Sequence, residues 1–217
     1  MSIFNKLFHT NKASPKNTLS STMSFLFGST TAGQNVTERT AMQNTAVYAC
    51  VRVLAESLAT LPLHLYQLTD DGGKQRVNDH SLSFLLHDAP NPEMTSFIFR
   101  ETMMNHLLLW GNAYAQIIRN GQGQITGLYP LMPDRMDVNR ARNGVLYYTY
   151  TRNYEDYQAK DESKQVILLS DEVLHIAGLG FDGLIGYSPI ALAKNAIGLS
   201  LAAEQYGSTF FKNDATP

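Results

Sequence analysis

The sequence contains almost no cysteine, since Cys50 is the only one in 217 residues. A single thiol excludes an intramolecular disulfide and a thiolate-bound metal cluster. Because Cys50 stands inside an apolar helical pattern, we expect a buried, small hydrophobic side chain rather than a reactive thiol. The lack of disulfides favours a reducing, cytoplasmic compartment.

Charge is also scarce and nearly balanced, with 17 basic and 19 acidic residues and a net charge of -2. This balance argues against a broad phosphate-binding surface, because nucleic-acid-binding domains usually carry a clear basic excess. One weak basic edge stays open as an alternative, at Arg135, Arg140 and Arg142 around the predicted meander. Asp134 and Asp137 interrupt that group, so a mixed solvated surface is the simpler interpretation.

Long apolar runs are missing too. No stretch approaches the ~18 consecutive apolar residues that cross a bilayer, so we expect no membrane partner. Residues 1–40 begin with a short amphipathic segment that carries Ile3, Phe4, Leu7 and Phe8, and continue as a polar stretch. They are predicted to form a flexible N-terminal arm.

Catalytic patterns are lacking as well: there is no HExxH helix, GxSxG elbow or P-loop. Gly178–Gly183 matches GxGxxG, but a dinucleotide site needs a helix that opens directly on the loop and an acidic residue ending a second parallel strand. Here Leu184–Tyr187 intervene, and Glu204 falls within a predicted helix. We therefore expect a glycine loop, no cofactor, no metal and no enzymatic activity. Nucleotide binding is kept as an alternative.

Helical periodicity is present in three segments. Residues 40–62 show apolar positions at three- and four-residue steps and end at a proline. The predicted buried face of this first helix is Val47, Val51, Leu54, Leu58 and Leu61. The second helix, residues 95–110, is predicted to start at Thr95 or Ser96 and to bury Phe97, Met104 and Leu108. The third, residues 188 to about 211, is Ala-rich, with Ser188 as N-cap and Pro189 in the first turn.

Alternating apolar patterns predict strands between the second and third helices. The predicted strands are residues 113–119, 125–131, 136–139, 145–151, 165–169 and 173–177, with a separate hairpin at 63–68 and 74–77. His64 and His175 are expected to be partly buried polar positions within strands. The strand spacing is that of an antiparallel meander, so the predicted class is α+β. We expect a domain over residues 41–187 and a long helix over residues 188–217.

Trp110–Ala115 joins the second helix to the first meander strand. We expect Gly111 to let the chain turn there and Asn112 to satisfy backbone groups at that turn. Trp110 and Tyr114 are expected to pin the helix to the sheet.

Seven stretches give the chain a family resemblance when their order and spacing are taken together. They are Ala49–Leu63 with Cys50, Arg52 and Pro62; Leu85–Thr95 with Pro90, Asn91 and Pro92; Leu109–Tyr114 with Gly111 and Asn112; Leu128–Pro133 with Pro130; Val173–Ile176 with His175; Gly186–Ile190 with Ser188 and Pro189; and Phe210–Asn213 with Phe211. Over residues 40–213 the chain resembles the portal proteins of tailed bacteriophages, in the type typical of long non-contractile tails.

The resemblance implies a wing-type α+β domain with long helices packed on an antiparallel meander. It implies a ring, usually of twelve subunits, at one capsid vertex of the virion, after assembly in the bacterial cytoplasm. Such a ring is a head-tail connector through which double-stranded DNA passes non-specifically during packaging and ejection. Its partners would be the terminase large subunit, the major capsid and scaffold proteins and the head-tail adaptor. It has no enzymatic activity of its own.

Family members run to about twice this length, so the chain corresponds to roughly the N-terminal half. Residues 188–217 would lead toward the stem, and no channel-lining residues can be assigned. The alternative is a truncated, prophage-derived interaction module without portal activity.

Overall fold

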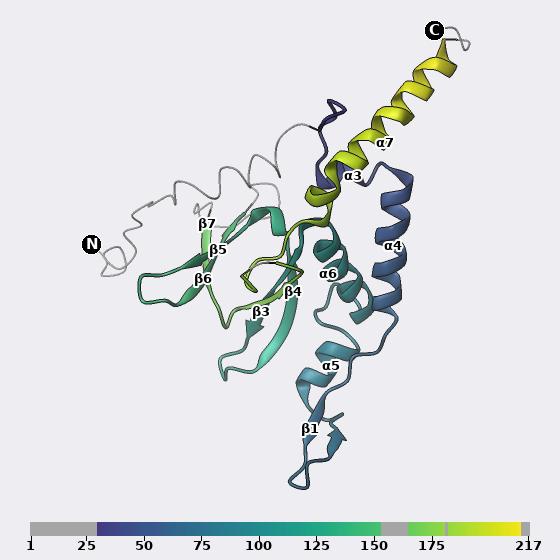
Figure 1. The fold of residues 1–217 in the computed structure, drawn as a ribbon. Helices are drawn as coiled ribbons and strands as arrows, with labels where there is room; N and C mark the ends of the chain where they lie inside the picture. Colours follow the sequence, from purple (N-terminus) through teal and green to yellow (C-terminus); the bar gives the residue numbers. More distant parts are fainter. Residues whose placement is uncertain (1–29, 153–164, 181, 214–217) are drawn as a thin grey trace.

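The computed structural model describes residues 30–152, 165–180 and 182–213 (Figure 1). The amphipathic start and most of the predicted arm therefore lie outside the described residues. The helices are α3 (Glu38–Ala41), α4 (Thr45–Ala59), α5 (Ser81–His87), α6 (Ser96–Trp110) and α7 (Pro189–Lys212), with the 3-10 turn η1 (Pro133–Arg135). The strands are β1 (Tyr66–Leu68), β2 (Lys74–Arg76), β3 (Asn112–Arg119), β4 (Ile125–Leu131), β5 (Met136–Arg140), β6 (Leu146–Thr151), β7 (Gln165–Leu169) and β8 (Val173–Ala177). No helix in these ranges is long and apolar enough to cross a membrane.

The strands form antiparallel sheets, so the α+β class is confirmed. A hairpin, β1-β2, stands apart, and the other six strands form two three-stranded sheets in the orders β4-β3-β8 and β5-β6-β7. The second sheet is a meander of consecutive strands. The first is not, because β8 returns across the molecule to pair with β3. This return brings the chain that leads into α7 beside the end of α6.

Helix α6 lies between α4 and the β4-β3-β8 sheet, while α7 and the β1-β2 hairpin project at opposite ends of the molecule (Figure 1). Toward the sheet, Phe99 and Met103 of α6 pack on Ala113, Ala115 and Leu128. These two alanines on β3 let the helix approach the strand closely. The burial of both faces of β3 makes it the central strand around which the other elements pack.

The predicted buried faces of the first two long helices were wrong in detail. On α6 the buried positions are Ser96, Phe99, Met103, His106 and Leu109, rather than the stripe predicted through residues 97, 104 and 108. The reason is that α6 is covered on two sides, so apolar residues surround most of it. Periodicity alone therefore could not select the face that meets the sheet.

On α4 the buried residues are Val51, Ala55 and Ala59, which give a narrow face for close contact with α6. The predicted residues Leu54, Leu58 and Leu61 are exposed instead, and so is the thiol of Cys50 that was predicted to be buried. The small side chains let α4 approach α6 closely, and the larger leucines lie on the sides of α4 that face away from α6. His64 is half-buried, as expected, but it precedes β1 instead of lying within a strand.

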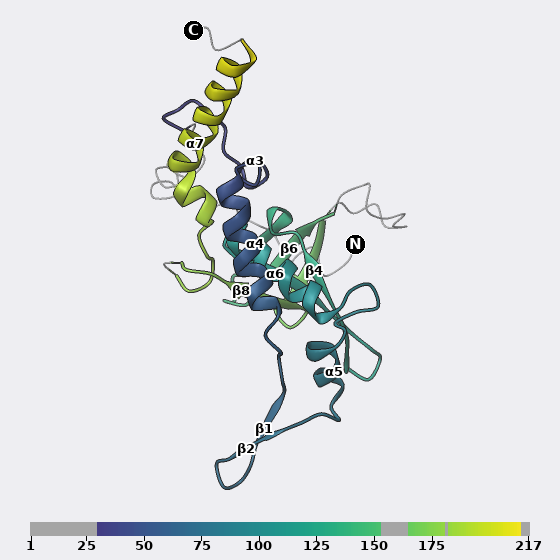
Figure 2. The same cartoon turned by 90° about the vertical axis from the view of Figure 1, so that its right-hand side faces the viewer.

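The segment before α4 is packed on α7 (Figure 2). Gly198 of α7 faces Thr30 so closely that a Cβ at residue 198 would lie 2.8 Å from the Thr30 side chain. Asn44, which is buried, caps α4 by accepting hydrogen bonds from the amides of Ala46 and Val47. Its Nδ2 donates across to Ser200 Oγ at 2.7 Å. Residues 30–40, expected to belong to a flexible arm, are thus part of the packed structure.

Candidate functional site

Asn112 is the centre of a buried junction between three stretches that lie far apart in the sequence. Its Nδ2 donates to the carbonyl oxygen of Gly186 at 2.9 Å and to that of Trp110 at 3.4 Å. Its Oδ1 accepts from the amide of Gly186 at 2.9 Å and from Nε2 of His175 at 3.1 Å. One amide side chain therefore holds the end of α6, the strand β8 and the loop that precedes α7.

Two glycines allow the chain to cross itself beside Asn112. Gly111 ends α6 in the left-handed region, with φ of 76°. A Cβ at Gly111 would lie 2.1 Å from the carbonyl oxygen of Tyr187, and a Cβ at Gly186 would lie 2.1 Å from that of Gly111. Any side chain at either position would force the two backbones apart, so this crossing requires glycine on both sides.

Aromatic rings enclose the other side of His175. The imidazole stacks on the ring of Tyr114, with centroids 4.4 Å apart, and its Nδ1 lies 3.3 Å from the hydroxyl of Tyr148. Because Nε2 donates to Asn112, Nδ1 is the acceptor from Tyr148. Burial lowers the pKa of His175 and raises that of Tyr114, so both side chains stay neutral near pH 7.

Ser188 fixes the start of α7 to the end of α6. As predicted, it is the N-cap: its Oγ accepts from the amide of Ala191 at 3.1 Å, and Pro189 occupies the first turn. The same hydroxyl donates to the carbonyl oxygen of Leu109 at 2.6 Å. The direction of the long helix is therefore set by the junction at Asn112.

A second, smaller junction joins the Pro90–Pro92 turn to β4. Nδ2 of Asn91 donates to the carbonyl oxygen of Leu128 at 2.7 Å. The backbone amide of Leu128 donates in turn to the carbonyl oxygen of Pro90 at 2.8 Å. Pro90 is fully buried. Pro130 lies in β4, which is the edge strand of its sheet and can accept a residue without an N–H.

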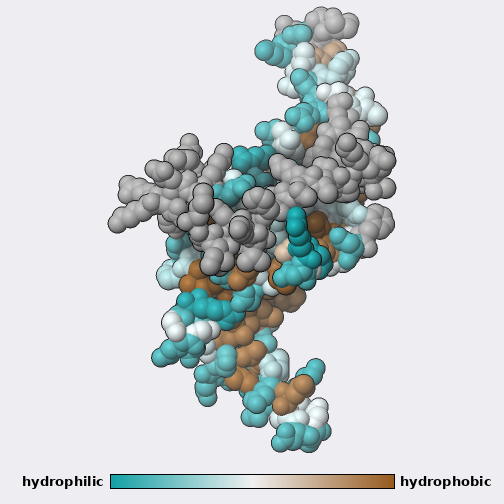
Figure 3. Space-filling view, turned by 90° about the vertical axis from the view of Figure 1, so that its left-hand side faces the viewer, coloured by the Kyte–Doolittle hydropathy of each residue, from teal (hydrophilic) through white to brown (hydrophobic). Residues whose placement is uncertain are grey.

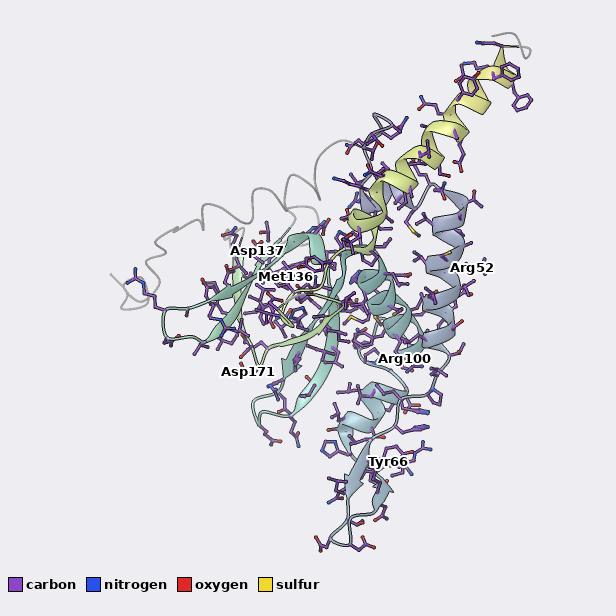
Figure 4. The ribbon with its side chains drawn as sticks, viewed as in Figure 1. Arg52, Tyr66, Arg100, Met136, Asp137 and Asp171 are labelled. Atoms are coloured by element: carbon purple, nitrogen blue, oxygen red, sulfur yellow. The ribbon has the colours of Figure 1, made fainter. Side chains whose placement is uncertain are left out.

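The remaining motif residues lie outside both junctions. Cys50 and Arg52 are exposed on α4, where Arg52 Nε pairs with Glu56 Oε1 at 2.7 Å (Figure 4). Pro62 follows the end of α4, and Phe211 is 77% exposed near the end of α7. Asn213 is the C-cap of α7.

The structure does not bring the three arginines of the proposed basic edge together. Arg140 and Arg142 lie at the β5-β6 turn, where Arg140 donates to the carbonyl oxygen of Gly144 at 2.7 Å. Arg135 lies at the other end of β5, roughly 16 Å of strand away. The weak basic edge that was kept as an alternative is therefore interrupted along β5, which agrees better with a mixed solvated surface.

The described residues of the glycine loop, 178–180 and 182–183, lie close to the segment that follows them. Oδ1 of Asp182 accepts from the amides of Leu184 and Ile185, and a Cβ at Gly180 would lie 2.1 Å from the carbonyl oxygen of Ile185. Helix α7 starts only at Pro189, and β8 runs antiparallel to its neighbour β3. A dinucleotide site needs a helix N-terminus at the loop and a parallel strand, and the described part of this region offers neither.

Two side chains that hold the layers together were missed at the sequence level. Arg100 on α6 donates through Nε and Nη2 to the carbonyl oxygen of Ala59 and through Nη1 to that of Leu86 (Figure 4). It therefore caps the ends of both α4 and α5. His106 is buried against Trp110, its Nδ1 has no hydrogen-bond partner, and burial lowers its pKa to about 4. The only signal was a polar residue inside an apolar helix pattern.

The junctions define a rigid α+β structural domain whose turns and helix directions are fixed by buried polar side chains. The family model "Phage portal protein" matches residues 45–217, and the chain belongs to that family.

Curated relatives agree with this membership. The portal protein of Enterobacteria phage HK97 is 33% identical over 183 residues, covering 83% of this chain and 41% of that protein. The probable portal protein of Streptomyces phage phiC31 is 36% identical over 194 residues, covering 86% and 40% respectively. The chain thus spans about two fifths of the length of these relatives.

Solved structures share the fold. The neck of a native gene transfer agent particle, computed with C12 symmetry, matches with a TM-score of 0.63 and 21% identity, covering 92% of this chain and 52% of that chain. The crystal structure of an HK97 family phage portal protein from Corynebacterium diphtheriae matches with a TM-score of 0.51 and 16% identity, covering 80% and 49%.

Proposed function

We propose that this chain is part of a portal subunit, which forms a ring at one vertex of a phage capsid. The observation that carries the proposal is the family match over residues 45–217, reinforced by the meeting of five of the seven motif stretches at two buried junctions. The names of the HK97 and phiC31 relatives support it, as does the likeness to a neck structure with C12 symmetry. Twelve copies per ring follow from that symmetry by analogy.

In this role the chain has no chemistry to perform. Residues 30–187 form the wing-type domain, and residues 188–217 lead toward the stem. The ring gives double-stranded DNA a passage for packaging and ejection, and docks the terminase large subunit, capsid or scaffold proteins and the head-tail adaptor. A net charge of -2 suits a passage for DNA, because tight phosphate contacts would hold the DNA in place. The protein assembles in the bacterial cytoplasm and ends in the virion.

The test is deletion of the gene followed by complementation. Complementation by the natural gene is expected to restore DNase-resistant genome copies, and a gold-labelled tag on the protein is expected at a single capsid vertex. A deletion that leaves packaging unchanged, or a label absent from particles, would contradict the proposal. The second outcome would favour a prophage-derived interaction module.

A further inference from the structure

The outward side of α4 is apolar and uncharged. Figure 2 shows that α4 leads directly into the chain that approaches the β1-β2 hairpin. Seven apolar side chains of this stretch are exposed. They are between 42% and 72% exposed and comprise Val53, Leu54, Leu58, Leu61, Leu63, Tyr66 and Leu68. We call this the α4 surface. The charged residues of α4, Arg52 and Glu56, pair with each other along its margin.

A helix surface of this kind is unusual in contact with water, because solvated helix faces are normally charged or polar. The seven side chains together expose on the order of 700 Å², an area comparable with the largest apolar patch of a typical monomer. That area is close to the ~800 Å² per partner of a standard protein interface. The α4 surface is therefore large enough to be one half of a subunit interface.

A second apolar surface lies on the opposite side, on the outer face of the β5-β6-β7 sheet. Along β7, Val166 and Leu168 point into the core, so Ile167 and Leu169 point outward and are 51% and 53% exposed. Tyr147 of β6 is the register partner of Leu169 and shares this face, and Val145 nearby is 51% exposed. We call the face that carries Val145, Tyr147, Ile167 and Leu169 the sheet surface. Figure 3 views the molecule from this side and shows further apolar residues lower on the same side.

Strand β7 is also an edge strand, with β6 on one side and no described strand on the other. Proteins protect exposed edge strands, and one common way is to cover them with a helix. The segment Gln165–Ser170 carries no charge, and neither do the seven residues of the α4 surface, although Arg76 and Lys74 of β2 stand opposite Tyr66 and Leu68. The apolar side chains of α4 and those of the edge strand β7 are therefore matched in chemistry.

We propose that the α4 surface of one copy packs on the sheet surface of the next copy. This inference rests on the proposed function, because a closed ring requires each subunit to present two different surfaces on nearly opposite sides. With twelve copies each subunit turns by about 30° relative to its neighbour, which agrees with α4 and β7 at opposite edges of the molecule in Figure 1. A second copy supplies both partners at once, whereas one covering segment of the same chain would occupy only one surface.

The test uses two variants that each spoil one surface. Leu54→Glu places a carboxylate in the α4 surface, and Ile167→Glu places one in the sheet surface. The control is Phe84→Glu, which makes the same kind of change at an exposed apolar side chain on α5. In sedimentation velocity, the unchanged chain and Phe84→Glu are expected to form oligomers that grow with concentration. Each of the other two is expected to self-associate roughly 100-fold more weakly. Mixing the two spoiled variants restores one intact interface, so the mixture yields dimers and nothing larger.

The single cysteine gives an independent readout. Cys50 is exposed on α4, so a photo-activated cross-linker on its thiol reports which residues face that helix. With isotopically labelled and unlabelled copies mixed, cross-links are expected between copies, into the segment Gln165–Ser170. A disulfide between two Cys50 residues indicates a symmetric contact and overturns the proposal. A variant mixture that stays monomeric overturns it too, because one intact interface should hold the two variants together.

An unchanged chain that stays monomeric at every concentration, or cross-links confined to one chain, overturns it as well. Neither result affects the gold label at the capsid vertex. Failure of this interface and failure of the portal role are therefore distinguished.

Discussion

Alanine substitutions at three glycines separate the two physical demands of the crossing beside Asn112. Gly111 has a positive φ, and its Cβ position lies 2.1 Å from the carbonyl oxygen of Tyr187. Gly144 has a positive φ of 85° but no atom within 4 Å of its Cβ position, while Gly186 lies outside the left-handed region and has only the close contact. Gly111→Ala therefore tests the positive φ and the close contact together. Gly144→Ala tests the positive φ alone, and Gly186→Ala tests the close contact alone.

The expected costs follow from these geometries. An alanine forced into the left-handed region loses about 1 kcal/mol of stability, which is the whole effect expected for Gly144→Ala. A Cβ at 2.1 Å from a backbone oxygen must push that backbone away by about 1 Å, so Gly186→Ala is expected to cost about 3 kcal/mol. Gly111→Ala combines the two effects, at about 4 kcal/mol. This is a large fraction of the 5–15 kcal/mol of a typical domain.

Thermal unfolding followed by circular dichroism measures the three variants, with urea midpoints as a second assay. Each kcal/mol lowers Tm by roughly 3 °C in a chain of this size, so Gly144→Ala is expected to lose about 3 °C and Gly111→Ala about 12 °C. Equal losses for Gly111→Ala and Gly144→Ala would refute the close crossing. A loss confined to Gly111, with Gly186→Ala neutral, would show that only the left-handed turn matters.

Three further predictions concern buried polar side chains. Asn112→Ala leaves the amide and carbonyl of Gly186 without partners and is expected to cost about 3 kcal/mol in a urea titration; a loss below 1 kcal/mol would contradict its central role. Asn44→Ala removes an N-cap and a link to Ser200 and is expected to cost about 2 kcal/mol, and a neutral result would show that α4 and α7 hold together without it. For His106, burial lowers the folded pKa to about 4, so the unfolded chain takes up the proton first as the pH falls. Stability should fall by up to about 3 kcal/mol between about pH 6.5 and 4, and His106→Phe should remove that part of the slope, as measured by unfolding at each pH.

The element boundaries could be predicted because local chemistry sets them. The strands β7 and β8 begin and end where their alternating apolar patterns do, and Ser188 caps α7 as its position before Pro189 indicates. Turn residues and caps act over a few positions, so a single sequence carries that information. The pairing of β8 with β3 joins segments about sixty residues apart and left no local trace.

The buried faces of the helices could not be predicted, because apolar residues exceed what one face can hold. On α4 the small residues Ala55 and Ala59 are buried on the side that packs against α6, whereas the more hydrophobic Leu54 and Leu58 are exposed. The junction was predicted only in part. Asn112 was expected to satisfy backbone groups at its own turn, but its two shortest bonds reach Gly186, 74 residues away. Spacing along the chain does not encode such a partner.

The family motifs divide into two groups once they are placed in the structure. Residues such as Asn91 and Asn112 are buried, and their side chains form hydrogen bonds with backbone groups of the same chain. Cys50 on α4 and Phe211 at the end of α7 are exposed and add little to the fold of a single copy. A portal subunit must hold its own shape and also fit its neighbours, and these are separate physical demands. The exposed motif positions on α4 and at the end of α7 are therefore the part of the resemblance that the fold of a single chain does not explain.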